Sequence, residues 1–387
     1  MSLSRCSRDC AARRRTQLSV RSKHARRCQL GARRTGAPGK MCAVRRVLHI
    51  LPHRGGGGET YIDLLMGLDG YAHARAPLSA GRTPASAAAS LPLRWPRLLR
   101  AARDADIVHS HGDVASTLVL ALPHGRPLVV TTHGLHFLRR ATGVRLAVAQ
   151  RSMRAVAGRA ARVLCTSQAE HDELAELLGA ALAPRLVVAR NGVAASMPRD
   201  GEQRAAIRAQ LGLADGDVTA LFLGELSARK APLLAAEAAR RAGSDGAPIV
   251  LLVAGDGPQA GELHAQASAA VRPLGFRDDS ARLLAAADVF VLPSSREGLS
   301  FAVLEAMANG LAIVVADGPG NPEAVGDAGV VVAAGDVDAF ASALRRLAQD
   351  RGERERLGAA ARERARSVFS IERMLGAVAA AYADALR

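Results

Sequence analysis

The sequence is poor in aromatic residues, with one Trp and three Tyr among its 387 residues and 3% Phe, Trp and Tyr overall. So few rings argue against a base-stacking surface for nucleic acid and against an aromatic shelf for carbohydrates. The sequence also has no run of about 18 apolar residues, which excludes a membrane-spanning helix. With 49% hydrophobic and 23% charged residues, the composition is that of a globular protein, and the length suits two domains.

Cysteine is nearly absent from the body of the chain, because four of the five cysteines precede residue 43 and Cys165 is the fifth. A body with one cysteine has no disulfide framework, which is typical of a reducing compartment, so we expect a cytoplasmic protein. Cys165 has no evident base partner, and no G-x-S-x-G motif is present. Hydrolase chemistry is therefore disfavoured.

Residues 1–40 form a basic leader with twelve Lys and Arg but one acid, Asp9, and they account for most of the net charge of +16. We expect no structure in this segment. Three interpretations are open: a start placed too early, with Met41 as the natural first residue; a disordered basic arm; or an Arg- and Ser-rich transit peptide. The first is favoured because the first strand pattern follows Met41 directly. Nucleic acid is not expected as a partner.

From residue 44 onward, short apolar runs alternate with helical segments rich in Ala, Leu and Arg. Most of these runs lack polar alternation, as expected for parallel strands buried on both faces. The runs predict strands at 44–51, 106–110, 128–132, 162–166, 186–189, 219–224, 249–255, 271–274, 289–292, 312–316 and 330–333. The pattern predicts an α/β protein with two doubly wound, Rossmann-like parallel sheets.

A polar stretch with Pro, Gly and an Asp-Gly pair marks the expected boundary between the two domains. The expected segments are a leader (1–40), a first domain (41–195), a linker (196–216), a second domain (217–365) and a C-terminal helix (366–387) that can pack back on the first domain. Because ligands of open α/β sheets bind beyond the carboxyl ends of the strands, two such sheets predict a cleft between the domains.

Two glycine-rich loops follow predicted strands. Residues 53–59, with the sequence HRGGGGE, place glycine amides before a helix, which suits a phosphate, although a flexible connection explains the composition equally well. Residues 255–261, with the sequence GDGPQAG, only loosely imitate a dinucleotide fingerprint because their spacing is GxGxxxG. We therefore expect no nicotinamide cofactor.

A third loop, PSSREGLSFAVLE, lies between an apolar strand and a helix. The amides of Gly298, Leu299 and Ser300 are expected to point at an anion. Glu297 and Glu305 are eight residues apart, which a helical path would separate by roughly 12 Å. The paired carboxylates of glycoside hydrolases lie about 5 to 9.5 Å apart, so this spacing suits two acids that grip opposite ends of a long ligand around a diphosphate. A capping acid and a surface acid are the open alternative.

Together these motifs resemble those of retaining glycosyltransferases of family 4, which have the GT-B fold. The resemblance covers about residues 44–365. It is carried by Gly57-Gly58, Asn191-Gly192-Val193, the Gly-x5-Lys segment from Gly224 to Lys230, Gly255-Asp256-Gly257-Pro258, the PSxxEG loop with its Glu-x7-Glu pair, and Glu323. It implies transfer of a hexose-type sugar, without a metal, from a nucleotide diphosphate sugar to a lipid-linked, glycan or small-molecule acceptor, in polysaccharide or glycolipid biosynthesis.

The resemblance also implies roles for individual residues. Glu297 would bind hydroxyls of the donor sugar, Glu305 the ribose and Lys230 the diphosphate, while His133 would lie near the reacting sugar and acceptor. The implied catalytic residues are His133, Glu297 and Lys230. The implied donor-binding residues are Gly57, Gly58, Arg229, Lys230, Gly255, Phe276, Ser294, Glu297, Gly298, Leu299, Ser300 and Glu305.

One position departs from the family pattern. The family usually has Arg directly after the first Gly of the Gly-x5-Lys segment, but this chain has Glu225. Because an acid cannot stabilise a departing diphosphate, we expect Arg229 to supply part of the missing positive charge.

We expect no metal and no cofactor. None of the three Asp-x-Asp pairs, at 104/106, 215/217 and 336/338, follows a strand at the expected cleft, and the third is a plausible helix cap. A zinc site at His109 and His111 lacks a convincing third ligand.

Residues 137–162 hold seven Arg and no acid, which suits either contact with an anionic inner membrane surface or a solvated helix face. Two rival functions remain: a GT-B-like nucleotide-sugar isomerase (epimerase) and a non-catalytic nucleotide-sugar-binding protein.

Overall fold

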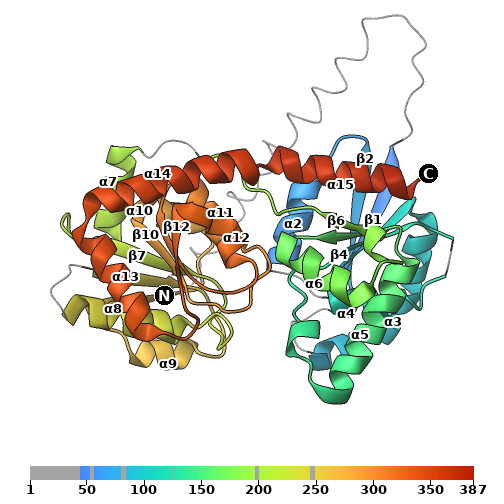
Figure 1. Ribbon diagram of the computed structural model, residues 1–387, viewed down its shortest axis with the longest axis horizontal. Helices are drawn as coiled ribbons and strands as arrows, with labels where there is room; N and C mark the ends of the chain where they lie inside the picture. Colours follow the sequence, from blue (N-terminus) through green and yellow to red (C-terminus); the bar gives the residue numbers. More distant parts are fainter. Residues whose placement is uncertain (1–43, 53–55, 80–83, 124, 197–199, 245–248) are drawn as a thin grey trace, which may run out of the picture. The chain divides into compact units, whose positions relative to one another are not determined.

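The computed structural model describes residues 44–52, 56–79, 84–123, 125–196, 200–244 and 249–387 (Figure 1). The basic leader, residues 53–55 of the first glycine-rich loop and residues 197–199 of the expected linker lie outside the described residues. Residues from Val44 to Arg387 belong to one compact unit. Among the described helices, none combines the length and the apolar character needed to cross a membrane.

The first sheet has six parallel strands in the order β2-β1-β3-β4-β5-β6. Its strands are β1 (Arg45–Leu51), β2 (Tyr71–Pro77), β3 (Ile107–His111), β4 (Leu128–Thr131), β5 (Arg162–Cys165) and β6 (Leu186–Val188). The helices between them are α2 (Gly57–Leu65), α3 (Pro84–Asp104), α4 (Asp113–Val119), α5 (Gly143–Arg159) and α6 (Gln168–Leu178). Apolar side chains of α3, α4, α5 and α6 pack on one face, and those of α2 pack on the other.

The second sheet also has six parallel strands, in the order β12-β11-β10-β7-β8-β9. Its strands are β7 (Val218–Leu223), β8 (Ile249–Ala254), β9 (Val271–Gly275), β10 (Val289–Leu292), β11 (Ala312–Ala316) and β12 (Gly329–Val332). Its flanking helices are α7 (Gly201–Gln210), α8 (Pro232–Ser244), α9 (Ala260–Ala265), α10 (Ser280–Ala286), α11 (Phe301–Ala308), α12 (Asn321–Val325), α13 (Val337–Gln349) and α14 (Arg351–Val368). The two doubly wound parallel sheets confirm the predicted fold class.

The central strands are continuous apolar runs because both of their faces are covered. Every residue of β8, β10 and β11 is buried. Short polar side chains start several helices: Asp336 accepts a hydrogen bond from the amide of Ala339 at 2.9 Å, and Ser167 accepts one from that of Glu170 at 3.2 Å. Apolar strand and polar cap therefore alternate along the chain as a parallel α/β fold requires.

Each predicted strand overlaps an observed one, but β2 was not predicted. Its sequence, YAHARAP, has Ala at exposed positions and lacks β-branched residues, so its propensity for a strand is low. It forms at the edge of the sheet because β1 offers a complete ladder of partners from Arg45 to Leu51. This strand carries His73.

The chain ends in helix α15 (Ile371–Ala385), which packs on the first sheet together with α2. Tyr382 of α15 is fully buried there. Phe369 lies two residues before this helix, and its carbonyl accepts a hydrogen bond from the amide of Val193 at 2.7 Å. Within the expected linker, Asp200 caps α7, which packs against α10 of the second sheet. The domain boundaries themselves stay a prediction.

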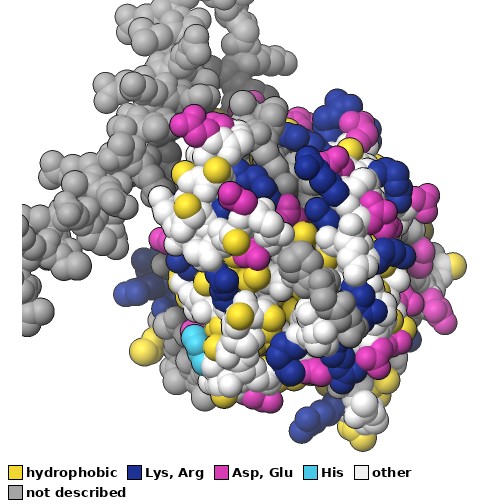
Figure 2. All heavy atoms as spheres, turned by 90° about the vertical axis from the view of Figure 1, so that its left-hand side faces the viewer, with side chains coloured by type: hydrophobic (Ala, Val, Ile, Leu, Met, Phe, Trp, Pro, Cys, Tyr) yellow, Lys and Arg dark blue, Asp and Glu magenta, His cyan; other side chains and the backbone are white. Residues whose placement is uncertain are grey.

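The surface shown in Figure 2 carries basic and acidic side chains mixed together. Among the described residues, many Arg side chains have acidic partners, such as the pairs Arg241–Asp338, Arg346–Glu353 and Arg366–Glu363. A mixed surface of this kind differs from the single-sign basic surface that is typical of nucleic-acid-binding proteins.

Candidate functional site

The turn between β10 and α11 holds the acid Glu297 in a fixed position. Ser294 is buried, and its hydroxyl donates to Oε1 of Glu297 at 2.5 Å. Helix α11 begins only at Phe301, with Ser300 as its N-cap, so Glu297 precedes the helix. The helical path assumed between Glu297 and Glu305 is therefore wrong for its first four residues: residues 297–300 form a turn that puts backbone amides ahead of the helix.

Two cations meet the carboxylate of Glu297, which is only 5% exposed. Nζ of Lys230 lies 2.8 Å from it, and Nη1 of Arg229 lies 3.0 Å from Oε1. Burial alone would raise the pKa of Glu297, but Lys230 and Arg229 outweigh that effect, so the pKa is below its ordinary value. The site therefore holds an ionised acid between two cations.

The acid at position 225 does not enter this cluster directly. Glu225 is exposed, and its Oε2 lies 3.4 Å from Nη2 of Arg229. Arg229 thus spans Glu225 and Glu297, and it reaches the same carboxylate as Lys230. A guanidinium therefore reaches Glu297 from position 229, whereas position 225 carries an acid.

Close backbone contacts explain two glycines around this cluster. A Cβ atom on Gly255 would lie 1.8 Å from the carbonyl oxygen of Gly224, so the loops after β7 and β8 touch through their backbones. A Cβ atom on Gly320 would lie 1.1 Å from the carbonyl oxygen of Gly298. These loops approach so closely that no larger residue fits at either position without displacing the chain.

The loop after β4 contributes His133 and has a strained backbone. His133 and Leu135 both have positive φ angles, 54° and 50°, which non-glycine residues rarely adopt. Gly134 lies against the Glu297 turn, because a Cβ atom on Gly298 would be 3.0 Å from the Cα of Gly134. Strain of this kind is typical of functional loops that the surrounding structure holds in place.

Two residues of the same loop region were not predicted as site residues. Nη1 of Arg139 donates to the carbonyl oxygens of Gly134 at 3.1 Å and Glu297 at 3.4 Å. Burial, followed by the charge of Arg229, lowers the pKa of His136 to about 4. Both residues follow a predicted strand closely, in the sequence TTHGLHFLRR, and that position could have identified them as candidate site residues.

Glu170 of α6 is a third unpredicted residue beside the turn. It is fully buried and accepts hydrogen bonds from the hydroxyl of Thr132 at 2.6 Å and the amide of Thr166 at 2.8 Å. Burial raises its pKa. Its Oε1 has no hydrogen-bond partner and would be 2.7 Å from a Cβ atom on Gly298. Ser167 and Glu170 form the S-x-x-E pattern of an ordinary capping box, so the sequence alone predicts a helix cap and does not indicate the contact with Gly298.

Polar contacts join the loops after β5 and β6 to the second sheet's elements. Oε1 of Glu323 accepts from Nε of Arg190, and its Oε2 accepts from the amide of Gln168, both at 2.7 Å. Nδ2 of Asn191 donates to the carbonyl of Leu299 at 2.6 Å. The family-type residues Asn191 and Glu323 therefore hold the turn and α12 in place.

The other predicted donor-binding residues lie on α2, on α11 and after β9. Glu305 lies on α11, burial raises its pKa, and its carboxylate has no hydrogen-bond partner among the described residues. Gly57 and Gly58 are the first residues of α2, and a Cβ atom on Gly57 would lie 3.6 Å from the ring of Phe301 at the start of α11. Phe276 follows β9 and is 74% exposed. The start of α2 therefore lies beside the start of α11, whereas Phe276 is open to solvent.

The Asp-x-Asp pairs have structural partners. Asp106 accepts from the amide of Arg46, Asp217 from that of Ala214, and Asp336 caps α13 as predicted. One group of three possible metal ligands occurs in the described part of the chain: nitrogen atoms of His49, His109 and His111 lie within 4.8 Å of one another. His49 is thus the third nitrogen that the sequence did not reveal beside His109 and His111. Each ring nitrogen of the three already has a hydrogen-bond partner within the protein.

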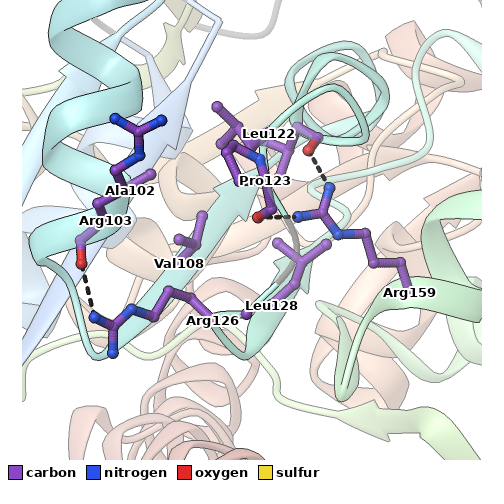
Figure 3. Close-up of a pocket in the computed structure, with 10 residues that line it drawn as sticks. Ala102, Arg103, Val108, Leu122, Pro123, Arg126, Leu128 and Arg159 are labelled. Carbon is purple, nitrogen blue, oxygen red and sulfur yellow. Dashed lines mark hydrogen bonds between the residues drawn. The ribbon is translucent and has the colours of Figure 1, made fainter.

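A cavity in the first sheet's layer lies away from this site. It measures about 250 Å³ and lies near the starts of β3 and β4, at the opposite end of the strands from His133 (Figure 3). Arg126 donates to the carbonyl of Arg103 at 2.8 Å, and Arg159 donates to that of Pro123 at 3.1 Å. These guanidinium groups satisfy carbonyls near the ends of α3 and α4, so the cavity has a structural explanation.

Comparisons with known sequences identify the family of this chain. A family described as glycosyl transferases group 1 matches residues 217–350, and one described as glycosyltransferase family 4 matches residues 49–196. The chain is 32% identical over 311 residues to a D-inositol 3-phosphate glycosyltransferase of Streptomyces bingchenggensis, covering 73% of this chain and 67% of the relative. It is 33% identical over 298 residues to a glycogen synthase of Mycobacterium tuberculosis, covering 73% and 69%.

Solved structures share the fold. HepE from Anabaena, crystallised with UDP and glucose, superposes with a TM-score of 0.74 at 21% identity, covering 87% of this chain and 98% of HepE. Similarity at this level of identity concerns the arrangement of strands and helices.

Proposed function

The chain belongs to the glycosyltransferases of group 1 and family 4, and from that premise we propose that it is a retaining, metal-independent hexosyltransferase. Its donor would be a nucleotide diphosphate sugar, and UDP-glucose is the first candidate because HepE is crystallised with UDP and glucose. Its acceptor would be a lipid-linked, glycan or small-molecule hydroxyl, in polysaccharide or glycolipid biosynthesis in the cytoplasm.

The observation that carries this proposal is the cluster of Arg229, Lys230 and Glu297. Without a ligand, Glu297 neutralises the two cations at 3.0 and 2.8 Å. A bound diphosphate would supply negative charge in its place, and the amides of the turn ahead of α11 would add to the positive field. The cations are therefore positioned before the reaction begins, which lowers the cost of reorganisation in the transition state.

Glu297 would then be free to accept hydrogen bonds from hydroxyls of the donor sugar. Glu305 lies farther along α11 and has a half-buried carboxylate without a hydrogen-bond partner in the described structure, which suits two ribose hydroxyls. Phe276, exposed after β9, would lie against the base. These assignments use each acid for binding, and none of them requires a nucleophile.

The reaction proceeds by departure of the diphosphate and attack of the acceptor hydroxyl from the same face of the sugar. The bond from the anomeric carbon to the phosphate oxygen breaks, the bond to the acceptor oxygen forms, and the acceptor proton passes to the departing phosphate. Lys230 and Arg229 stabilise the charge that develops on the phosphate. We expect no metal requirement because this cationic pair would neutralise the charge on the departing diphosphate, as a divalent ion does in metal-dependent enzymes.

Helix α5 favours an acceptor at a membrane surface. Its side chains Val144 and Val148 are 81% and 60% exposed, and Arg145, Arg151 and Arg154 of the same helix are also exposed. Exposed apolar residues interspersed with Arg suit peripheral contact with anionic lipid, as expected for a lipid-linked acceptor. Sedimentation with phosphatidylcholine vesicles, with and without phosphatidylglycerol, tests this; binding that is unaffected by a Val144→Asp, Val148→Asp variant would contradict it.

The decisive experiment incubates the full chain with UDP- and GDP-sugars, with and without acceptors, in the presence of EDTA. Nucleotide release that depends on an acceptor and persists in EDTA supports the proposal, and NMR of the product checks retention at the anomeric carbon. Interconversion of the donor sugar without an acceptor would instead indicate an isomerase. Failure to bind any nucleotide sugar would leave a non-catalytic role.

A further inference from the structure

Five histidines gather around one face of the first sheet, beneath α2 and α15. His49 of β1 pairs in register with His109 of β3, and His111 lies two residues farther along on the same face. These three are at most 1% exposed. His73 of β2 and His133 after β4 flank them and are partly exposed. The cluster therefore extends from the edge of the sheet to the candidate active site.

Four of these histidines form one continuous chain of hydrogen bonds. Nδ1 of His73 lies 2.8 Å from Nε2 of His49, and Nδ1 of His49 lies 2.9 Å from Nε2 of His111. Nδ1 of His111 lies 3.0 Å from Nε2 of His133. His109 is outside the chain, because its two nitrogens bond to the hydroxyls of Tyr382 and Thr131, both at 2.7 Å.

All four rings are neutral near neutral pH. Burial is the first cause that lowers the pKa of each of them, and that of His133 falls to about 3. A neutral imidazole has one N–H donor and one bare nitrogen acceptor. Each ring must donate to one neighbour and accept from the other, so the tautomer of one ring determines the tautomers of the other three. Only two proton arrangements are therefore possible: Nδ1–H on all four rings, or Nε2–H on all four.

The end of the chain at His73 decides between the two arrangements. Nε2 of His73 is buried and has no hydrogen-bond partner. If it carried the proton, an N–H donor would be left unsatisfied, which is rarer in folded proteins than an unsatisfied acceptor. The arrangement with Nδ1–H on each ring is therefore preferred.

We propose that His73, acting through His49 and His111, fixes the tautomer of His133 so that His133 presents its Nδ1–H as a hydrogen-bond donor to the ligand. None of the described residues hydrogen-bonds to that Nδ1, which leaves it available. His133 then binds an oxygen of the donor sugar or the acceptor and does not remove the acceptor proton. Its identity as a ligand-binding residue rests on the proposed function, whereas the tautomer itself does not.

Nitrogen-15 NMR of the full chain, labelled at histidine, measures the tautomers directly and requires no activity. Single substitutions assign the signals. The expected result is a protonated Nδ1 and a bare Nε2 on His49, His111 and His133, which is the tautomer that free histidine disfavours. A protonated Nε2 on His133 would overturn the proposal even if the protein transfers sugar, and the expected pattern would stand even if the proposed donor were wrong.

A matched pair of variants tests whether His73 determines the tautomer of His133. In His73→Asn, the side-chain amide can donate to Nε2 of His49 as Nδ1–H does, whereas His73→Leu removes the donor. We expect His133 to keep its tautomer in H73N, and to become a mixture in H73L with kcat about tenfold lower and KM for the donor little changed. If both variants fold and His133 has the same tautomer in each, His73 does not determine that tautomer. If H73L fails to fold, the NMR spectrum of the unmodified chain still decides the tautomer.

Discussion

Nζ of Lys230 lies 2.8 Å from the carboxylate of Glu297, so the residue expected to bind the diphosphate and the residue expected to bind the sugar form an ion pair with each other. Arg229 joins the same carboxylate at 3.0 Å. The three side chains form one ion-pair cluster, which the proposed donor would have to separate. Both partners are already desolvated and oriented, which is the condition under which charges contribute most to a transition state.

Replacing Glu297 with Ala is expected to reduce turnover more than binding. The two cations remain and still attract the diphosphate, but the sugar loses an acceptor for its hydroxyls and is less well placed. We expect kcat to fall by about 10²–10³, with the Kd for the donor changed less than about tenfold. Steady-state kinetics and calorimetric titration with the donor separate the two effects. A large loss of affinity with normal turnover at saturation would reverse the assignment.

Glu297 should also make stability depend on acidic pH. Its pKa in the folded protein is below the ordinary value of 4.5, so its ion pairs stabilise the protein at and above that pH. This contribution is lost as the pH falls through the folded-state pKa and the carboxylate is protonated. We expect the Tm of Glu297→Gln to change less than that of the unmodified protein as the pH is lowered from about 6 to 3. Parallel Tm curves would contradict the ion-pair account.

Glu305 should behave in the opposite way. Burial raises its pKa, so its ionised form costs stability once the pH rises through the folded-state value. Glu305→Gln removes that charge and is expected to raise the Tm at neutral pH. The same change should weaken nucleotide-sugar binding, because an amide cannot accept from two ribose hydroxyls as a carboxylate does. Thermal shift with and without donor measures both effects, and a variant with lower Tm and unchanged donor affinity would refute the assignment.

A charge swap tests whether Arg229 replaces the arginine that the family usually has at position 225. Arg229→Ala should lower kcat by about 10² because one of the two cations at the leaving group is removed. Adding Glu225→Arg to that variant should restore part of the loss, since it replaces an acid near the site with a guanidinium at the position where the family usually has one. Glu225→Arg alone serves as the control. Failure of the double variant to exceed Arg229→Ala would show that the two positions are not equivalent.

Much of the fold followed from the sequence because buried parallel strands are continuous apolar runs. The segment VFVL at 289–292 and the segment AIVVA at 312–316 are strands with the predicted bounds. Strand β2 was missed because its pattern consists of Ala, His and Arg, and only the ladder offered by β1 makes it a strand. A local pattern contains no information about such a partner.

Some residues of the candidate site were likewise predicted from the sequence, and others were not. Glu297, Lys230 and Arg229 were found because they follow strands in a recognisable spacing, and the structure places them together. Glu170 and the histidine chain were not found, because their contacts join residues 22 to 62 positions apart, or a capping box to a glycine more than a hundred residues away. Only tertiary packing brings such groups into contact, and a fully buried polar side chain looks in sequence like any other.

Gly298 is the residue where the loop regions of both sheets meet, so a single methyl group there should have a large effect. A Cβ atom would lie 2.7 Å from Oε1 of Glu170 and 3.0 Å from the Cα of Gly134, and the second contact is backbone that cannot simply rotate away. Gly298→Ala should therefore displace the turn that carries Glu297, lowering the Tm by several degrees and kcat by at least about tenfold. Gly261→Ala is the matched control, because a Cβ atom there meets nothing within 4 Å and the position lies inside α9. That control should be neutral or slightly stabilising. Equal Tm and kcat in the two variants would mean that the turn and the loop after β4 are not in contact in solution.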